Sequence, residues 1–170
     1  MLSSSAVLGV IRFVLLVLAQ VLIFNDMGFY GLVNPMVYVL FVYWYPIENN
    51  RTLFLLVSFL LGLTLDAFSD SLALHTMATT TIAFVRPLIM RFCFGANFDF
   101  QGFSLRNTSR IQRYTLLALL IFVHHLIFFS LEAFSFSHFL LILKKLLFVG
   151  LGTFVLSFLI NTLFSREGNR

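Results

Sequence analysis

The sequence predicts an all-α integral membrane protein, built as a single polytopic domain over residues 1–170. Of the 170 residues, 60% are hydrophobic and only 11% are charged, and the mean hydropathy is +0.99. A soluble domain is about half apolar and about a quarter charged. This chain therefore has too few polar residues to cover a water-soluble surface. Several apolar segments also approach the roughly 20 residues that a helix needs to cross a bilayer.

Six segments are apolar enough, and long enough or nearly so, to be interpreted as spanning helices. They cover residues 7–24, 29–47, 52–68, 72–92, 114–134 and 140–164. The first has no basic residue before its apolar run and no small-residue cleavage site after it. We therefore interpret it as a retained helix rather than a signal peptide. The longest loop, residues 95–112, is too short to fold alone, so any soluble chemistry would come from a partner.

The arginines predict how these helices are oriented. If the N-terminus is cytoplasmic, every arginine falls at a cytoplasmic helix end or loop: Arg12, Arg51, Arg86, Arg91, Arg106, Arg110, Arg113, Arg166 and Arg170. The outer loops then hold no arginine, although they hold Asp26, Asp70 and Glu132. This asymmetry is the positive-inside pattern, and it predicts that both termini are cytoplasmic.

Lys144 and Lys145 are the exception, because they lie near the outer end of the last predicted helix. Either they snorkel to the outer interface, or residues 138–143 lie along the membrane surface and the span starts near Leu146. The sequence leaves both interpretations open.

The net charge of +4 does not predict a nucleic-acid partner, because no basic run alternates with exposed aromatic residues. One basic segment is nevertheless distinctive. Arg106, Arg110 and Arg113 recur at helical spacing beside Leu105 and Ile111. This pattern predicts an interfacial segment that contacts anionic membrane lipid or a cytoplasmic partner.

The main functional signal is a group of polar residues in the third and fourth predicted spans. A charged residue inside a membrane costs about 2.5–3.5 kcal/mol on insertion scales. Asp66 and Asp70 are four residues apart and so share a helix face. The stretch FSDS after Asp66 favours a turn, with Ser69 or Asp70 capping the next helix. We expect this turn to bring Asp66 next to His75, where a hydrogen bond would lower the cost of burying both.

Several roles remain open for this group, which also includes Thr79. The pair formed by Asp66 and His75 can simply lock the helical hairpin, since polar residues in membranes commonly pair with one another. Alternatively, the pair belongs to a proton relay, a partner contact or a ligand site. Threonines in a membrane helix usually mark close helix packing, and ligand contact is the less common case.

No metal, cofactor or enzymatic activity is predicted. His124 and His125 are adjacent and point about 100° apart, so they do not easily bind one ion. A site formed by His75, Asp66 and one of them lacks the ligand spacing that metals require. Cys93 is the only cysteine, which excludes an internal disulfide. No Ser–His–Asp order, nucleotide loop or HExxH motif is present.

Two further features concern helix packing. Arg86 and Pro87 lie within the fourth predicted span, where the proline would kink the helix. Arg86 either snorkels toward the cytoplasmic side or pairs with a neighbouring helix. Gly62, Gly150 and Gly152 allow helices to approach closely.

The stretch GLTLDAFSDSLALHTMATT, followed by AFVRPLIM, contains Gly-Leu-x-x-Asp, then a short turn and a helix of small residues. In this pattern the chain resembles the MreD family of rod shape-determining membrane proteins. The residues that carry the resemblance are Gly62, Leu63, Asp66, Phe68, Ser69, His75, Arg86 and Pro87. The stretches IRFVLLVLAQVLIFN and NPMVYVLFVYWYPIE resemble the form found in Bacteroidota. Family members often have glycine where this chain has Ala73.

The resemblance implies a fold similar to the substrate-binding subunits of energy-coupling-factor transporters, in the bacterial inner (cytoplasmic) membrane. It also implies a non-catalytic scaffold of the cell-wall elongation machinery that maintains rod shape. The implied partners are an MreC-like membrane protein, a RodA–PBP2-like synthase and an MreB-like filament. The fold similarity supplies an alternative, a small-molecule or lipid-binding subunit of a transporter-like complex. The two differ in whether the group around Asp66 is packed shut or lines an open cavity.

Overall fold

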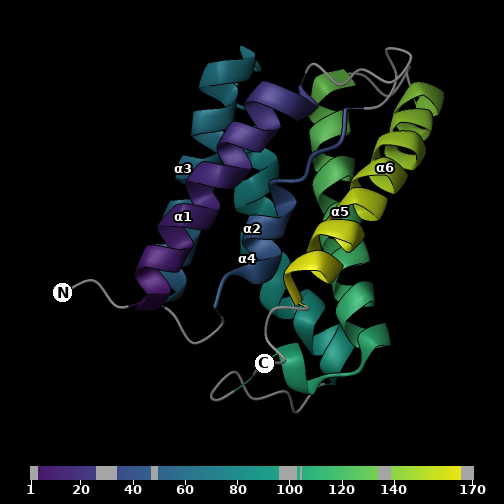
Figure 1. Cartoon of the computed structure of the whole chain (residues 1–170). Helices are drawn as coiled ribbons and strands as arrows, with labels where there is room; N and C mark the ends of the chain where they lie inside the picture. The colour runs from purple at the N-terminus through teal and green to yellow at the C-terminus, as the bar shows by residue number, and fades with distance from the viewer. Residues whose placement is uncertain are drawn as a thin grey trace.

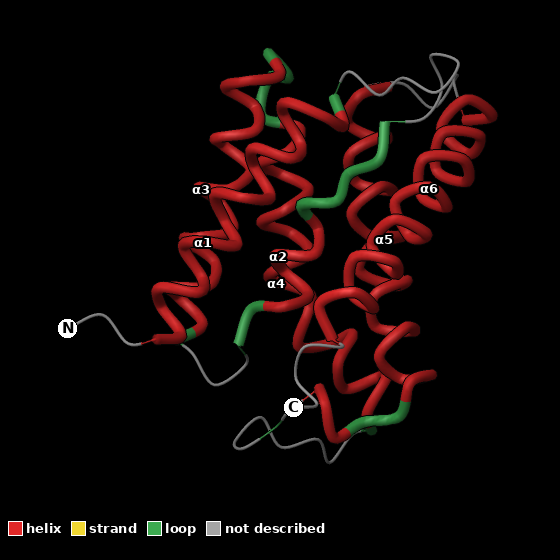
Figure 2. The backbone as a smooth tube through the Cα atoms, in the orientation of Figure 1, coloured by secondary structure: helices red, strands yellow, loops and turns green. Residues whose placement is uncertain are grey.

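The computed structural model describes residues 4–25, 34–46, 50–95, 103, 105–133 and 139–165, in which helix is the only regular secondary structure (Figures 1 and 2). In chain order the elements are α1 (Ser4–Ala19), the π-helix η1 (Gln20–Phe24), α2 (Val39–Trp44), α3 (Arg51–Ser69), α4 (Leu74–Phe94), the 3-10 helix η2 (Leu105–Asn107), α5 (Arg110–Ala133) and α6 (Phe139–Ser165). From α3 to α6, each long helix packs against the next one along the chain.

Five helices among the described residues are long and apolar enough to cross a membrane, as expected of a membrane-embedded, multi-pass protein. They are α1 with its continuation η1, and then α3, α4, α5 and α6. The bounds of α3, α4 and α6 follow the predicted spans closely. Helix α5 instead begins at Arg110 rather than at residue 114.

The span predicted at residues 29–47 is not a continuous helix in its described part. Residues 34–38 are not helical, and α2 has only six residues. Pro35 favours a break here, because proline lacks an N–H donor and disfavours helical geometry in the residue before it. Figure 2 shows this segment as a loop leading into α2, running along the bundle toward the end where α3 begins. Six crossings of the membrane therefore remain a prediction.

The backbone of this broken segment is buried, so its polar groups need partners within the protein. The amide of Gln20 supplies two of them: Nε2 donates to the Pro35 carbonyl at 3.1 Å, and Oε1 accepts from the Val37 N–H at 3.0 Å. The Met36 N–H donates to Oγ1 of Thr153 at 3.0 Å. Side chains from η1 and α6 thus replace the hydrogen bonds that a continuous helix would have made.

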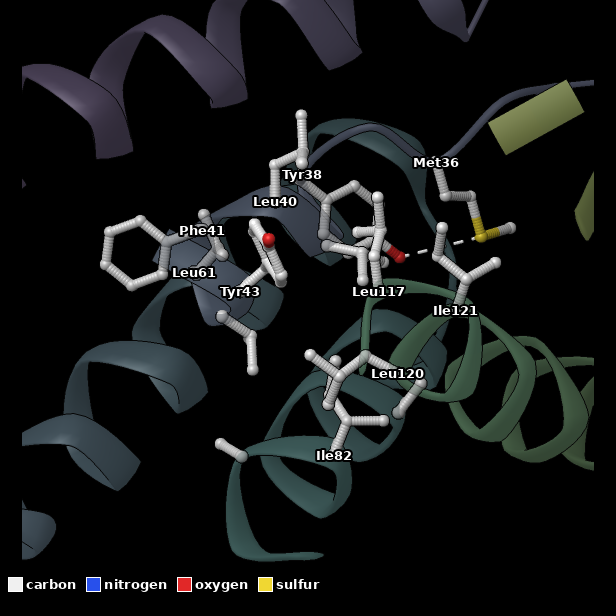
Figure 3. Packing of buried hydrophobic residues seen from close by; sticks show 14 of the residues in the cluster. Met36, Tyr38, Leu40, Phe41, Tyr43, Leu61, Ile82, Leu117, Leu120 and Ile121 are labelled. Atoms are coloured by element: carbon white, nitrogen blue, oxygen red, sulfur yellow. Dashed lines mark hydrogen bonds between the residues drawn. The ribbon is translucent and has the colours of Figure 1, made fainter. Parts of the chain in front are cut away.

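The segment that contains α2 lies at the centre of the core. Tyr38 and Tyr43 are at most 2% exposed, and Leu40 is fully buried. Figure 3 shows these residues facing side chains of α3, α4 and α5, among them Leu61, Ile82, Leu117, Leu120 and Ile121. The long helices therefore pack around a short helix rather than only against one another.

Helices α3 and α4 form a closely packed hairpin. A Cβ atom added to Gly62 would lie 2.4 Å from the Cα of Thr76, so no side chain fits at this crossing. The turn between the helices has positive φ angles at Asp70 (51°), Leu72 (43°) and Ala73 (68°). Glycine adopts this left-handed conformation most readily, so Ala73 occupies a position that would suit glycine.

The two ends of the bundle carry different charges. At one end, which we call the arginine-rich end, α3 begins with Arg51, α4 ends near Arg91 and α5 begins with Arg110. At the other end, which we call the hairpin end, α3 turns into α4 and α5 ends near Glu132. The first turn of α1 and the last turn of α6 both lie toward the arginine-rich end (Figure 1). This arrangement agrees with the predicted orientation, which remains a prediction.

Candidate functional site

The Asp66 carboxylate, at the hairpin end of α3, lies against the first turn of α4. Its Oδ1 accepts from the Ser71 hydroxyl at 2.6 Å and from the His75 N–H at 2.9 Å. Its Oδ2 accepts from the N–H and the hydroxyl of Thr76, at 2.8 and 2.5 Å. The N-cap residue Ala73 has no capping side chain, so Asp66 takes that role from the neighbouring helix. Negative charge is favourable at this end of a helix.

This geometry differs from the predicted one in two respects. Asp66 meets His75 at the backbone N–H, whereas we expected a bond to the ring. Ser69 and Asp70 do not cap α4; Asp70 instead ends α3 in the left-handed conformation and is exposed. Ser69 accepts a hydrogen bond at 2.8 Å from the amide of Asn25. Of the two aspartates, only Asp66 contributes to the buried site.

The His75 ring belongs to a second set of contacts, centred on Tyr38. The Tyr38 hydroxyl lies 2.6 Å from His75 Nδ1 and 2.9 Å from His124 Nε2. The hydroxyl also lies 3.7 Å from Met36 Sδ (Figure 3), a weaker acceptor than a ring nitrogen. A hydroxyl has one proton, so we expect Tyr38 to donate to one ring and accept from the other. The buried Nδ1 of His124 has no partner in the described part of the chain. Because an orphaned N–H is rarer than an orphaned acceptor, the favoured arrangement has His124 Nε2–H donating to Tyr38, and Tyr38 donating to His75.

His125 faces a different neighbour, although it adjoins His124 in the sequence. Its Nδ1 lies 2.9 Å from the Ile121 carbonyl, which can only accept, so Nδ1 carries the proton. In the neutral ring, Nε2 then accepts from the Thr153 hydroxyl at 3.1 Å. Thr153 in turn accepts from the Met36 N–H. His125 therefore ties α5 to α6 and to the broken segment.

We refer to Tyr38, Asp66, Ser71, His75, Thr76 and His124 as the polar cluster. Thr79, predicted to belong with these residues, is fully buried on α4, but its hydroxyl has no partner within the described ranges. It therefore lies outside the hydrogen-bonded set. The cluster joins the segment before α2 to three long helices, α3, α4 and α5.

Arg86 lies on α4 toward the arginine-rich end, is only 3% exposed, and pairs with a neighbouring segment rather than snorkelling. Its Nη2 donates to the carbonyls of Tyr43 and Tyr45, at 3.2 and 2.7 Å. These carbonyls end α2, so Arg86 satisfies acceptors that the broken segment leaves open. The guanidinium also lies 5.1 Å from the centre of the Phe54 ring on α3. Helix α4 continues through Pro87 as far as Phe94.

The basic segment predicted from residue 105 to residue 113 is divided into two helical pieces. Helix η2 ends at Asn107, and α5 starts at Arg110. The start of α5 is set by a capping box, in which the Ser109 hydroxyl accepts from the Gln112 N–H at 3.2 Å and the Ser109 N–H donates to Gln112 Oε1 at 3.2 Å. Arg110 and Arg113 thus lie in the first turn of a spanning helix. The side chain of Arg106 lies outside the described residues.

Lys145, whose role the sequence left open, forms an ion pair with Glu132. Its Nζ lies 2.7 Å from Glu132 Oε2, and both side chains are 38% exposed. The pair connects α5 and α6 near the hairpin end of the bundle. Of the remaining residues that carry the family resemblance, Leu63 and Phe68 are exposed on α3, at 46% and 65%.

Sequence reasoning did not identify three central residues of this interior: Tyr38, Gln20 and Thr153. Gln20 offered a signal, because it is the one strongly polar residue in the apolar half of α1 and η1 after Arg12. Tyr38 and Thr153 offered none, since each lies in an ordinary apolar stretch. Their partners are 86 and 117 residues away in the sequence, at His124 and Met36.

The polar cluster is a hydrogen-bonded network in which, among the described residues, the buried Nδ1 of His124 is left without a partner. Within the described ranges, no group of three or more histidine, cysteine, aspartate or glutamate residues is placed to hold a metal ion. Each Asp66 oxygen accepts two hydrogen bonds from protein groups. The Tyr38 hydroxyl contacts His75, His124 and Met36. No known family model, curated protein or solved structure matched the chain in the comparisons.

Proposed function

We propose that the chain is a non-catalytic membrane scaffold of the bacterial cell-wall elongation machinery, of the MreD-like type. The observation that supports this most is that Asp66 and Tyr38, the centres of the polar cluster, are hydrogen-bonded to neighbouring protein groups. A substrate site needs polar groups that converge on empty space. Here Asp66 accepts four hydrogen bonds from protein groups, and no member of the cluster lines the cavity of about 480 Å³ at the other end of α4.

The outer helices support the same proposal. Only 17% of the spanning stretch of α1 and 22% of that of α6 are buried in the bundle, against 44% for α5. Exposed leucines such as Leu15 on α1 and Leu151 on α6 face outward. Helix faces of this kind pack against lipid or against the spans of a partner. In this proposal they contact an MreC-like protein and a RodA–PBP2-like synthase, and the arginine-rich end faces an MreB-like filament in the cytoplasm.

The proposal places the protein in the inner membrane with both termini cytoplasmic. Its competitor is a small-molecule-binding subunit of a transporter-like complex, which would need an open cavity at the polar cluster. The hydrogen bonding of the cluster argues against that alternative.

A pull-down from the native membrane in mild detergent tests the proposal. The tagged wild-type chain should recover the MreC-like and RodA–PBP2-like proteins, identified by mass spectrometry. Asp66→Ala should recover much less, because it disrupts the hairpin that shapes the partner-facing surface. Asp70→Ala is the matched control, since Asp70 is an exposed aspartate at the same turn. Recovery of a transporter ATPase module in place of the elongation proteins would contradict the proposal.

A further inference from the structure

A cavity of about 480 Å³ lies at the arginine-rich end, between the beginning of α3 and the second half of α4. Its volume falls in the range of ligand sites, roughly 300–1,000 Å³. Three arginines contribute to its walls: Arg51 from α3, and Arg86 and Arg91 from α4. None of the ten described residues that line it is acidic. The cavity therefore combines positive charge with an otherwise mostly apolar lining.

Aromatic rings hold two of these arginines in place. The Arg51 guanidinium of α3 lies 5.2 Å from the centre of the Phe84 ring of α4. In the reverse direction, the Arg86 guanidinium of α4 lies 5.1 Å from the centre of the Phe54 ring of α3. Both rings also line the cavity. A guanidinium stacked on a ring is oriented in advance, so less side-chain entropy is lost when it binds an anion.

The internal contacts of Arg86 leave its charge unneutralised. Within the described residues its hydrogen bonds go to two neutral carbonyls, and its buried Nε has no partner there. Arg51 is the first residue of α3, where the helix dipole already favours an anion over a cation. Neither Arg51 nor Arg86 forms an ion pair within the described residues. An anion bound in the cavity would neutralise Arg51 and Arg86.

The apolar side of the cavity indicates what carries that anion. Phe84 and Leu88 line the cavity and are also 59% and 69% exposed on the outer face of α4. In a spanning helix such a face meets acyl chains. Arginine matches phosphate oxygens with two parallel N–H donors, and basic pockets at the ends of membrane helices bind lipid headgroups. We propose that this cavity binds the phosphate of an anionic phospholipid, with an acyl chain along Phe84 and Leu88.

The proposal is independent of the scaffold function, because it concerns the opposite end of α4 from the polar cluster. Its test uses the full chain in nanodiscs of phosphatidylcholine with a minor fraction of phosphatidylglycerol. Native mass spectrometry then measures which lipid stays bound after release. The wild type should retain phosphatidylglycerol well above its share of the bilayer. Arg51→Gln should lower that enrichment about tenfold, which corresponds to about 1.4 kcal/mol.

Arg110→Gln is the matched control, because Arg110 is also an exposed arginine that begins a spanning helix at the same end, but it lies outside the cavity lining. It should retain phosphatidylglycerol as the wild type does. Equal losses in the two variants would overturn the proposal in favour of a general charge effect. Equal retention of the two lipids by the wild type would also overturn it.

Two further experiments address the source of the phosphate and the role of Arg86. Glycerophosphate, which has the headgroup phosphate but no acyl chains, should not displace the bound lipid. Efficient displacement would overturn the lipid assignment and indicate a soluble anion.

Arg86→Lys keeps the charge but loses the paired donors, so it should also weaken retention of phosphatidylglycerol. Undiminished retention in this variant would remove Arg86 from the site.

Discussion

The two ends of α4 bury opposite charges in different ways. At the hairpin end, Asp66 receives four hydrogen bonds, two from backbone N–H groups and two from hydroxyls. Toward the arginine-rich end, Arg86 donates to two carbonyls, leaves Nε without a partner among the described residues, and borders a cavity. One charge is enclosed and satisfied, and the other is incompletely satisfied beside open space.

This difference suggests that one end of α4 stabilises the fold and the other end binds a ligand. A buried charge is costly unless its hydrogen-bonding capacity is filled. Where the protein itself fills that capacity, as at Asp66, the charge fixes the fold and has little left to offer a ligand. Where the capacity remains partly open, as at Arg86, a ligand can complete it. The polar cluster is therefore interpreted as structural, although it was the stronger signal in the sequence.

The largest effect is expected from Asp66→Ala. The N–H groups of His75 and Thr76 would lose their acceptor in a buried place, and each such loss costs about 1–3 kcal/mol. Asp66→Asn should cost less, but not nothing. All four hydrogen-bonding groups around the carboxylate are donors, so the amide NH₂ of asparagine must face one of the two backbone N–H groups. Unfolding by SDS in mixed micelles measures both variants. A fully stable Asp66→Ala would contradict the structural interpretation of this end.

Gly62→Ala should be nearly as damaging. The added Cβ would lie 2.4 Å from the Thr76 Cα. Because this is a backbone atom, a change of side-chain rotamer cannot relieve the clash. Overpacking of this kind typically costs about 1–3 kcal/mol. Gly150→Ala is the control, because a Cβ at Gly150 in α6 meets nothing within 4 Å. The same SDS titration compares the two, and equal stability would show that the hairpin is looser than described.

Tyr38→Phe should have an intermediate effect. It removes the hydroxyl that lies between His75 and His124 but preserves the packing of the ring. Interhelical hydrogen bonds in membranes contribute about 0.6 kcal/mol on average and about 1.7 at most. Tyr43→Phe is the matched control, since Tyr43 is an equally buried tyrosine on α2 with no hydroxyl hydrogen bond in the described residues. If both variants unfold alike, the Tyr38 bridge contributes nothing to stability.

The smallest effect is expected from Glu132→Gln. The ion pair with Lys145 is 38% exposed on both sides, and exposed pairs contribute about 0.2–1 kcal/mol. Its contribution should also decrease with added salt. Comparing the unfolding of the variant and the wild type at low and high salt measures this. If Glu132→Gln lowered stability as much as Asp66→Ala, burial would not explain the difference between the Glu132 and Asp66 carboxylates.

Much of the fold could be predicted because membranes impose simple constraints. The lengths of apolar runs located α3, α4 and α6, and the FSDS stretch located the hairpin turn. The prediction failed where a local signal opposed the hydropathy. Pro35 breaks the second predicted span, and the Ser109–Gln112 capping box starts α5 earlier than its apolar run. Both signals were present in the sequence.

The site could be predicted only in part. Asp66 and His75 were expected to meet because they lie on either side of one turn. The atoms that meet depend on how each helix is rotated about its axis. Counting residues along the sequence does not determine that rotation precisely enough. The link from Tyr38 to His124 spans 86 residues, and no local pattern encodes it. The arginine cavity was likewise hidden, because Arg51 and Arg86 come together only when α3 and α4 pair.

The most direct test of the contrast between the two ends of α4 measures two properties of the same two variants. Asp66→Ala and Arg51→Gln are each assayed for stability in SDS and for phosphatidylglycerol enrichment per folded molecule. We expect Asp66→Ala to lose stability but retain the lipid, and Arg51→Gln to retain stability but lose the lipid. Loss of the lipid at unchanged stability in Asp66→Ala, or easy unfolding with normal enrichment in Arg51→Gln, would contradict a structural role for Asp66 and a lipid-binding role for Arg51.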